Sequence, residues 1–81
     1  MKEHKLKTWQ PWFNDVVERR KTFEFRRDDR GFEVGDELIL EEYDPRTQTY
    51  GGSVCRVEVT YIVRCAPELP KGYCIMGISR W

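Results

Sequence analysis

The segment VCRVEVTYIVRC, residues 54–65, decides the fold class, because it is the strongest strand signal in the chain. Apolar side chains recur at every second position, which is typical of one face of a β-strand. The alternation assigns two sets of four side chains to opposite faces, namely Val57, Val59, Tyr61 and Val63 on one face and Arg56, Glu58, Thr60 and Ile62 on the other. We therefore expect a long strand here.

Shorter runs of the same kind surround this segment. Their positions are residues 4–8, 22–26, 37–43 and 73–78. In the third of these runs, Leu38 and Leu40 share one face. Turn-forming residues separate the runs, at 28–31, 34–36, 44–52 and 66–72. Aspartate, glycine and proline in such breaks favour turns and loops, so the chain is expected to contain about five strands.

Between the first two runs the apolar period lengthens. A stripe at helical spacing is formed by Trp9, Trp12, Phe13, Val16 and Val17. Pro11 suits a first helical turn, so we expect a helix over 11–19 that buries Trp12, Phe13 and Val16. The sequence thus predicts an α+β, mainly β fold: a small curved β-barrel of about five strands with one N-terminal helix packed beside it.

The chain of 81 residues is expected to form a single domain, residues 1–81. It carries 14 basic and 14 acidic residues, which excludes a strongly basic nucleic-acid coat. No apolar run is long enough for a membrane helix or a secretory signal. The three cysteines, Cys55, Cys65 and Cys74, form no C-x-x-C pair, so we expect reduced thiols that fill strands of a cytoplasmic protein.

The neutral total hides a segregation of charge. Residues 19–30 carry a net charge of +3, residues 31–44 carry −6 without a single base, and residues 45–81 carry +3. We expect the two basic segments to form one positive surface, with the acidic strand on the far side. Arginine-rich loops bind phosphates and polyanions. Charge runs are also typical of solvated faces, and both interpretations stay open.

One basic stretch carries a motif. Residues 19–26 read RRKTFEFR, which resembles the Gly-x-Lys-x-x-Glu-x-Arg signature of the ASCH domains, relatives of the PUA domains. Lys21, Glu24 and Arg26 match it, and Arg19 stands where the family has glycine. The similarity continues through residues 29–45, 59–62 and 72–77, where the chain resembles a small phage and bacterial branch of uncharacterised ASCH-like proteins.

The resemblance implies a PUA-like barrel with a cleft between the helix and the barrel. The family is proposed to bind RNA, so we expect a small module for RNA or a nucleotide-like ligand, with Lys21, Glu24 and Arg26 as the ligand-binding residues. A nucleic-acid rim is expected from the arginines nearby, Arg19, Arg20, Arg27 and Arg30. The same three motif residues also suit a structural ion pair that closes the barrel.

Two other functions are alternatives. Some ASCH proteins are similar to an amidohydrolase that deacetylates N-acetylated cytidine with a lysine and a threonine of the motif, and here Glu24 occupies the threonine position. The second alternative is a phage-type protein that binds a host protein through its acidic strand. We expect no cofactor and no membrane partner. A metal site at Glu41, Glu42 and Asp44 is disfavoured, because adjacent carboxylates on a strand point to opposite faces.

Three ring-bearing side chains near the N-terminus have both a functional and a packing interpretation. His4 is the single histidine, so any histidine-dependent catalysis would require it. At this position we expect a surface or packing residue instead. Trp9 and Trp12 are expected in the core because they lie on the apolar stripe. The alternative is that one of them, or Tyr43, is exposed and stacks on a nucleic-acid base.

Overall fold

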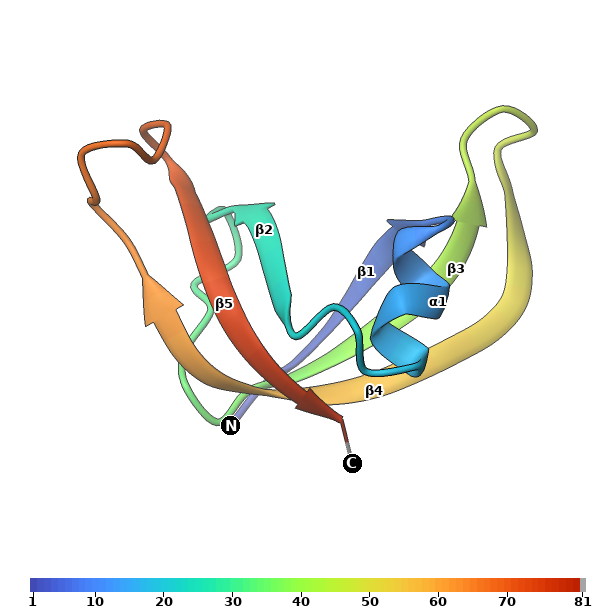
Figure 1. Ribbon diagram of the computed structural model, residues 1–81, viewed down its shortest axis with the longest axis horizontal. Helices are drawn as coiled ribbons and strands as arrows, with labels where there is room; N and C mark the ends of the chain where they lie inside the picture. The colour runs from blue at the N-terminus through green and yellow to red at the C-terminus, as the bar shows by residue number, and fades with distance from the viewer. Residues whose placement is uncertain (81) are drawn as a thin grey trace.

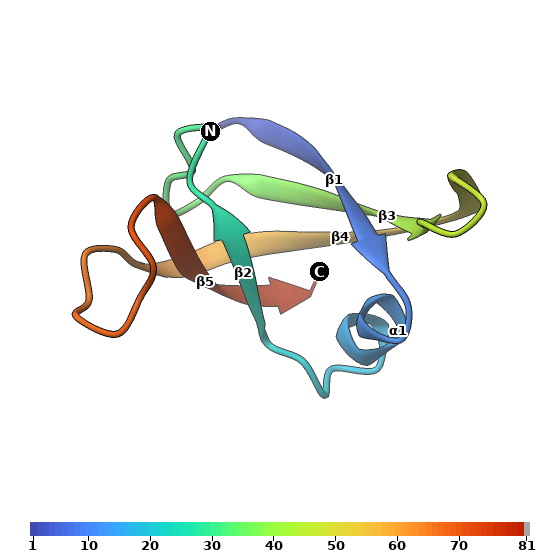
Figure 2. The same ribbon diagram turned by 90° about the horizontal axis from the view of Figure 1, so that it is seen from above.

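A computed structural model of the protein describes residues 1–80, and Trp81 lies outside them. Its elements in chain order are β1 (Glu3–Trp9), α1 (Trp12–Val17), β2 (Phe23–Arg27), β3 (Glu37–Asp44), β4 (Thr49–Val63) and β5 (Tyr73–Arg80). The strands form one sheet in the order β1-β3-β4-β5-β2, curled into a half-barrel (Figures 1 and 2). The prediction of a mainly β, strongly curved sheet of five strands with one helix is confirmed.

The connectivity leaves two strands at the edges of the sheet. β1 runs parallel to β3, whereas the other three pairings are antiparallel. β1 and β2 are therefore the two sheet edges, and they flank the opening of the half-barrel instead of pairing with each other. Parallel pairing requires a crossover connection, and α1, β2 and the loop that follows supply it between β1 and β3.

β4 is the central strand and the place where the sheet bends. Its first part pairs with β3 and its last part with β5, so one strand belongs to both arms of the half-barrel (Figure 1). The register to β5 shifts between Val59 and Tyr61, as in a β-bulge, and a bulge increases bending and reverses the facing of the residues after it.

This bulge corrects part of the sequence-based assignment. Val57 and Val59 are buried as expected, but Tyr61 is 67% exposed and Ile62 packs against the core in its place.

The predicted loop over residues 44–52 is also too long, since β4 already begins at Thr49. Among the cysteines, Cys55 and Cys74 fill strands, whereas Cys65 is exposed and follows the end of β4.

The core lies on the inner face of the curl. It consists of nine strand side chains, two helical ones and Phe32 from the loop before β3, namely Leu6, Phe13, Val16, Phe32, Leu38, Leu40, Cys55, Val57, Val59, Cys74, Met76 and Ile78. Leu38 and Leu40 share this face as predicted. Strand residues alternate between core and solvent, which is why the period-two runs located the strands well.

The helix is shorter than predicted, with six residues in place of the span 11–19. Phe13 and Val16 are buried as expected, but the expectation that Trp9 and Trp12 belong to the core is wrong. Trp9 and Trp12 are 48% and 49% exposed. The apolar stripe crosses a boundary, because Trp9 is the last residue of β1 and only the later members lie on α1.

His4 is a packing residue, as expected. Its Nε2 lies 2.9 Å from Oδ2 of Asp36, and its ring packs edge-on against Phe32 with centroids 4.8 Å apart. The same carboxylate accepts hydrogen bonds from the backbone N–H groups of Lys2 and Glu33. This buried cluster ties the start of β1 to the loop before β3. Within the described residues no helix has the length and apolarity that a membrane crossing requires.

Candidate ligand-binding cleft

A cleft lies where the half-barrel is open, between the edge strands β1 and β2 and beside α1. Its volume is about 780 Å³. The residues that line it are Lys7, Thr8, Trp9, Trp12, Asp15, Arg20, Lys21, Phe23, Glu24, Phe25 and Arg26. The structure thus brings the three predicted ligand-binding residues, Lys21, Glu24 and Arg26, into one concave site.

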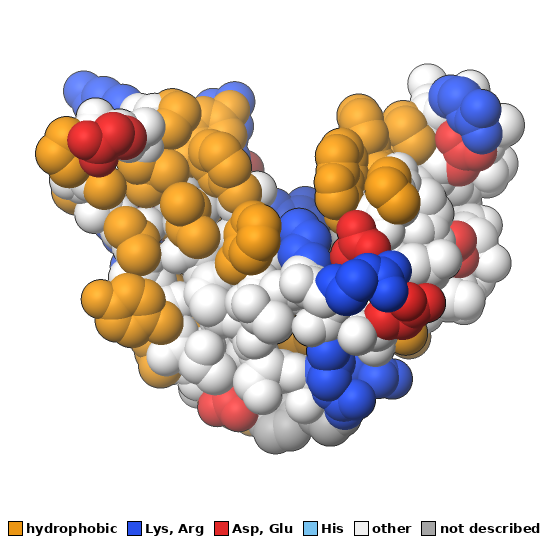
Figure 3. All heavy atoms as spheres, viewed as in Figure 1, with side chains coloured by type: hydrophobic (Ala, Val, Ile, Leu, Met, Phe, Trp, Pro, Cys, Tyr) orange, Lys and Arg blue, Asp and Glu red, His pale blue; other side chains and the backbone are white. Residues whose placement is uncertain are grey.

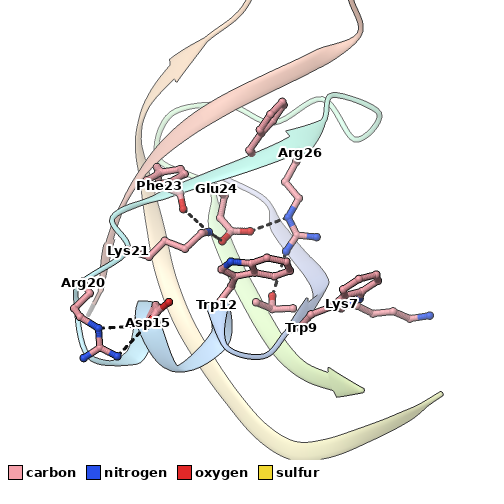
Figure 4. Close-up of a pocket in the computed structure, with 11 residues that line it drawn as sticks. Lys7, Trp9, Trp12, Asp15, Arg20, Lys21, Phe23, Glu24 and Arg26 are labelled. Atoms are coloured by element: carbon pink, nitrogen blue, oxygen red, sulfur yellow. Dashed lines mark hydrogen bonds and ion pairs between the residues drawn. The ribbon is translucent and has the colours of Figure 1, made fainter. Parts of the chain in front are cut away.

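An ion-pair cluster forms the floor of the cleft (Figure 4). Glu24 is only 2% exposed, and both of its carboxylate oxygens are occupied. Nζ of Lys21 donates to Oε2 at 2.5 Å, and Nε of Arg26 donates to Oε1 at 2.7 Å. Nη2 of Arg26 reaches across the opening to Oγ1 of Thr8 at 3.1 Å. A side-chain bridge therefore joins the two edge strands where backbone pairing is missing.

The local sequence explains how these side chains meet. β2 alternates, so Glu24 and Arg26 point to the inner face while Phe23 and Phe25 point outward. The alternation was predicted from sequence, and here the charged set occupies the inner face. Lys21 precedes the strand and donates a second hydrogen bond, to the backbone oxygen of Phe23 at 2.7 Å.

The helix end directs Lys21 toward the cleft. The N–H groups of Arg19 and Arg20 bond to the carbonyls of Val16 and Asp15, which is the Schellman pattern at a helix C-terminus. Arg19 occupies its left-handed position with φ 63°, and glycine is the usual residue there. The turn therefore forms with arginine at the position where the resembling family has glycine.

Aromatic side chains form the walls of the cleft. Trp9 and Trp12 stand on the side of β1 and α1, stacked with ring centroids 6.3 Å apart. Phe23 and Phe25 stand on the side of β2, and each is about half exposed. Figure 3 shows apolar side chains on both arms of the molecule with basic side chains between them. Trp9 and Trp12 thus match the alternative of exposed aromatics, not the core assignment.

Of the four arginines predicted to form a rim, one lines the cleft in the structure. Arg20 lines the cleft, where Nη2 lies 2.8 Å from Oδ1 of Asp15. Hydrogen bonds from this side chain to Asp15 and Glu18 raise the pKa of Arg20 above its usual value. The described lining residues do not include Arg19, Arg27 or Arg30.

The remaining rim arginines have other contacts. Arg27 lies over the ring of Tyr73 and donates to its hydroxyl at 3.1 Å. Arg30 donates to the backbone oxygen of Lys5 at 2.8 Å, on the free edge of β1. Three arginines of the segment 45–81 form ion pairs, namely Arg46–Asp44, Arg56–Glu37 and Arg64–Asp28. This part of the expected positive surface is therefore neutralised locally.

The arrangement favours binding over proton transfer. Each carboxylate oxygen of Glu24 already accepts a hydrogen bond from a cation, and Nζ of Lys21 donates to two oxygens, so Lys21 acts as a donor and not as a base. The floor instead presents the remaining N–H groups of Lys21 and Arg26. In the part of the chain that the structure describes, no three His, Cys, Asp or Glu side chains gather as a metal site would require.

Among the lining residues that sequence reasoning missed are Lys7 and Thr8. Their signal was the period-two pattern of the first strand, which places His4, Leu6 and Thr8 on the buried face. That pattern shows that Thr8 points inward but not that Arg26, 18 residues later, lies opposite it. A long-range contact of this kind depends on the strand order, which no local pattern contains.

Comparison with known proteins places the chain in a family. Residues 3–78 match the family described as a domain of unknown function, DUF3850. A protein of Escherichia phage P2, described as an uncharacterized 12.9 kDa protein in the GpA 3′ region, is 45% identical over 42 residues. That alignment covers 52% of this chain and 38% of the phage protein, and it agrees with the expected similarity to phage proteins. Because the family match spans nearly the whole sequence, the chain belongs to the DUF3850 family.

Proposed function

We propose that the protein binds RNA or a nucleotide-like ligand in the cleft between β1 and β2. The observation that carries this proposal is the pair of aromatic walls on either side of a cationic floor. Nucleic-acid bases stack on aromatic side chains whatever their sequence. Arginine side chains bond phosphates and base edges through several N–H groups at once. The cleft combines both features at the scale of one nucleotide.

The charge of the lining supports an anionic ligand. Four bases and two acids line the cleft, so its formal charge is +2; they are Lys7, Arg20, Lys21, Arg26, Asp15 and Glu24. Glu24 neutralises one of the two cations at the floor and holds both in place. A phosphate at this point would meet fixed donors, and preorganised donors bind more tightly than flexible ones.

We also propose that the protein is a PUA-like domain of the ASCH type. The curled sheet, the helix beside the opening and the motif at the cleft floor are what a PUA-like domain of the ASCH type would require. A cytoplasmic location completes the proposal, since free thiols such as Cys55, Cys65 and Cys74 are typical of reducing compartments.

Removal of one aromatic wall tests the binding site. Trp12→Ala is expected to weaken binding of a short single-stranded RNA by about 5- to 150-fold, because loss of one base–aromatic stack costs about 1–3 kcal/mol. Isothermal titration with an eight-nucleotide RNA of random sequence measures this. Tyr50→Ala is the matched control, because Tyr50 is an equally exposed aromatic that contacts Tyr43 and does not line the cleft. Equal affinities of the two variants would contradict the proposal.

The salt dependence tests the electrostatic part. The affinity for single-stranded RNA should fall with salt, with a log–log slope of about −0.7 for each phosphate neutralised. Replacement of Arg27 and Arg30 by alanine should flatten the slope and leave the fold intact, because both side chains are exposed. Arg46→Ala serves as control, since Arg46 contacts only Asp44 among the ion pairs found. Binding that is independent of salt would contradict this part.

The protein-partner alternative is separated by a bait experiment. In the acidic segment, Glu37 pairs with Arg56, Asp44 pairs with Arg46, and Glu42 accepts a hydrogen bond from Gln10 at 2.8 Å. These three acids therefore already have a partner within the chain. Recovery of nucleic acid on the immobilised protein would favour the proposed function, and recovery of one defined host protein without nucleic acid would favour the alternative.

A further inference from the structure

A second aromatic surface extends beyond the cleft, over the outer face of β2, β5 and β4. The strand register places eight residues on this face, and we call them the outer aromatic face: Phe23, Phe25, Arg27, Tyr61, Val63, Tyr73, Ile75 and Gly77. Four of the eight are aromatic. The residues between them, such as Glu24, Cys74 and Met76, point to the core. The face is therefore well defined by the alternation of the strands.

Apolar side chains on this face are exposed to solvent to an unusual degree. Tyr61 is the most exposed, and Phe23 and Phe25 are each about half exposed. Phe25 packs edge-on against Tyr73 with ring centroids 5.6 Å apart. Contiguous apolar patches of this kind on a small domain mark interaction surfaces. Figure 3 shows the apolar side chains gathered over one arm of the molecule.

The outer aromatic face is continuous with the cleft. Phe23 and Phe25 belong to both, because β2 is an edge strand and its side chains reach the opening. The bulge in β4 produces the other end of the face, since it turns Tyr61 outward opposite Gly77. A ligand that leaves the cleft past β2 would therefore meet a row of aromatic rings.

The charges on this surface favour an anionic ligand. The eight positions include one base, Arg27, and no acid. Nζ of Lys21 lies 4.9 Å from the ring centroid of Phe23, and the guanidinium of Arg27 lies 5.0 Å from that of Tyr73. Each end of the β2 edge thus carries a cation beside an aromatic ring. In such a pair the ring can stack on a nucleobase while the cation binds the adjoining phosphate.

We propose that single-stranded RNA continues from the cleft over the outer aromatic face, so that the site takes several nucleotides and not a single one. The inference rests on the proposed function and extends it. Phe23 and Phe25 are about 7 Å apart along the strand, and Tyr61 lies two strands away at about 10 Å. Rings at such spacings accept bases that are splayed apart, the form in which proteins read single-stranded RNA.

Tyr61→Ala tests the proposal, because Tyr61 is exposed and lies outside the cleft. The probes are an eight-nucleotide RNA of random sequence and a mixture of the four nucleoside monophosphates, each titrated by calorimetry. We expect Tyr61→Ala to weaken octanucleotide binding by about 5- to 150-fold, the effect of one lost base stack, and to leave mononucleotide binding unchanged. Tyr50→Ala is the matched control and should alter neither.

The other outcomes are distinguishable. If the octanucleotide binds no more tightly than the mononucleotides, or if Tyr61→Ala binds it normally, the extended site is refuted and the cleft proposal stands. Binding of neither probe would refute the proposed function itself. If the unmodified protein dimerises in sedimentation experiments without RNA and Tyr61→Ala does not, the face is an interface between copies of this chain and the inference fails.

Discussion

Two buried carboxylates, Glu24 and Asp36, are each 2% exposed, yet they are held in opposite ways. Glu24 lies between two side-chain cations, Lys21 and Arg26. Asp36 accepts from one side chain, His4, and from two backbone N–H groups. The two carboxylates are therefore equally buried but have different kinds of partner. The partners of Glu24 are side-chain cations with further donors, whereas those of Asp36 belong mainly to the backbone.

The surroundings of the two carboxylates differ as well. The partners of Glu24 line the cleft, and their own side chains are about one-fifth exposed. The cluster around Asp36 lies among β1, the loop before β3 and the ring of Phe32, away from the cleft. A carboxylate held by backbone groups secures the fold, and one held by cations at an opening positions those cations for a ligand.

Removal of Asp36 should have the largest effect. Asp36→Ala leaves two backbone N–H groups and His4 without an acceptor, so the free energy of unfolding should fall by about 3–5 kcal/mol. Urea unfolding followed by circular dichroism measures it. Asp36→Asn, which keeps one acceptor, should lose less and allow RNA titration of the folded protein. An altered RNA affinity of folded Asp36→Asn would contradict the purely structural role.

Glu24→Gln should cost less stability but affect binding. The freed Lys21 and Arg26 can turn to solvent in the cleft, so we expect a loss of about 1–3 kcal/mol in the free energy of unfolding. RNA affinity should fall despite the added positive charge, because the two cations lose their fixed positions. Calorimetric titration below the unfolding transition measures this. Unchanged affinity would make Glu24 a structural brace like Asp36.

Acid should weaken the Asp36 cluster in a defined range of pH. Burial, the largest influence, acts to raise the pKa of Asp36, but hydrogen bonds from His4 and from the backbone of Lys2 and Glu33 outweigh it and lower the pKa below its usual 3.8. A lowered pKa stabilises the fold above the unfolded-state value and loses that stabilisation as pH falls through the folded-state value.

The test compares unfolding free energies of the unmodified protein and Asp36→Asn between pH 6 and pH 2. Their difference should be constant down to about pH 4 and shrink below it. A difference that grows on acidification would reverse the sign of the argument.

The contrast also shows what the sequence predicts and what it does not. The period-two runs located all five strands, and the motif brought Lys21, Glu24 and Arg26 together because they are close in sequence. The bulge at Thr60 was not visible, since both neighbours are good strand residues. Trp9 was misassigned because a strand and a helix meet within one apolar stripe. The bridge from Arg26 to Thr8 depends on strand order, which local patterns do not encode.

Arg19→Gly should have a small, stabilising effect. Arg19 holds φ 63° at the end of α1, where a residue with a Cβ is strained and glycine is not. The gain exceeds the extra backbone entropy of glycine, so we expect about 0.5–1 kcal/mol in the free energy of unfolding. Glu18→Gly is the matched control, because Glu18 has φ −90° and gains no relief. Equal losses in both variants would contradict the strain argument.

The smallest expected effect concerns catalysis, where we predict no release of cytidine from N-acetylated cytidine above the buffer blank. An amidohydrolase of the resembling type needs a hydroxyl beside a lysine with an available lone pair. Here the hydroxyl position holds Glu24, and Nζ of Lys21 donates to Oε2 of Glu24 at 2.5 Å and to the backbone oxygen of Phe23 at 2.7 Å. Glu24→Thr restores the hydroxyl and releases one of these bonds, so any activity should appear first in that variant, followed by chromatography of released cytidine. Turnover by the unmodified protein that Lys21→Ala abolishes would reverse this ranking and make the cleft an active site, because a lysine that only positions a ligand has no chemical step to lose.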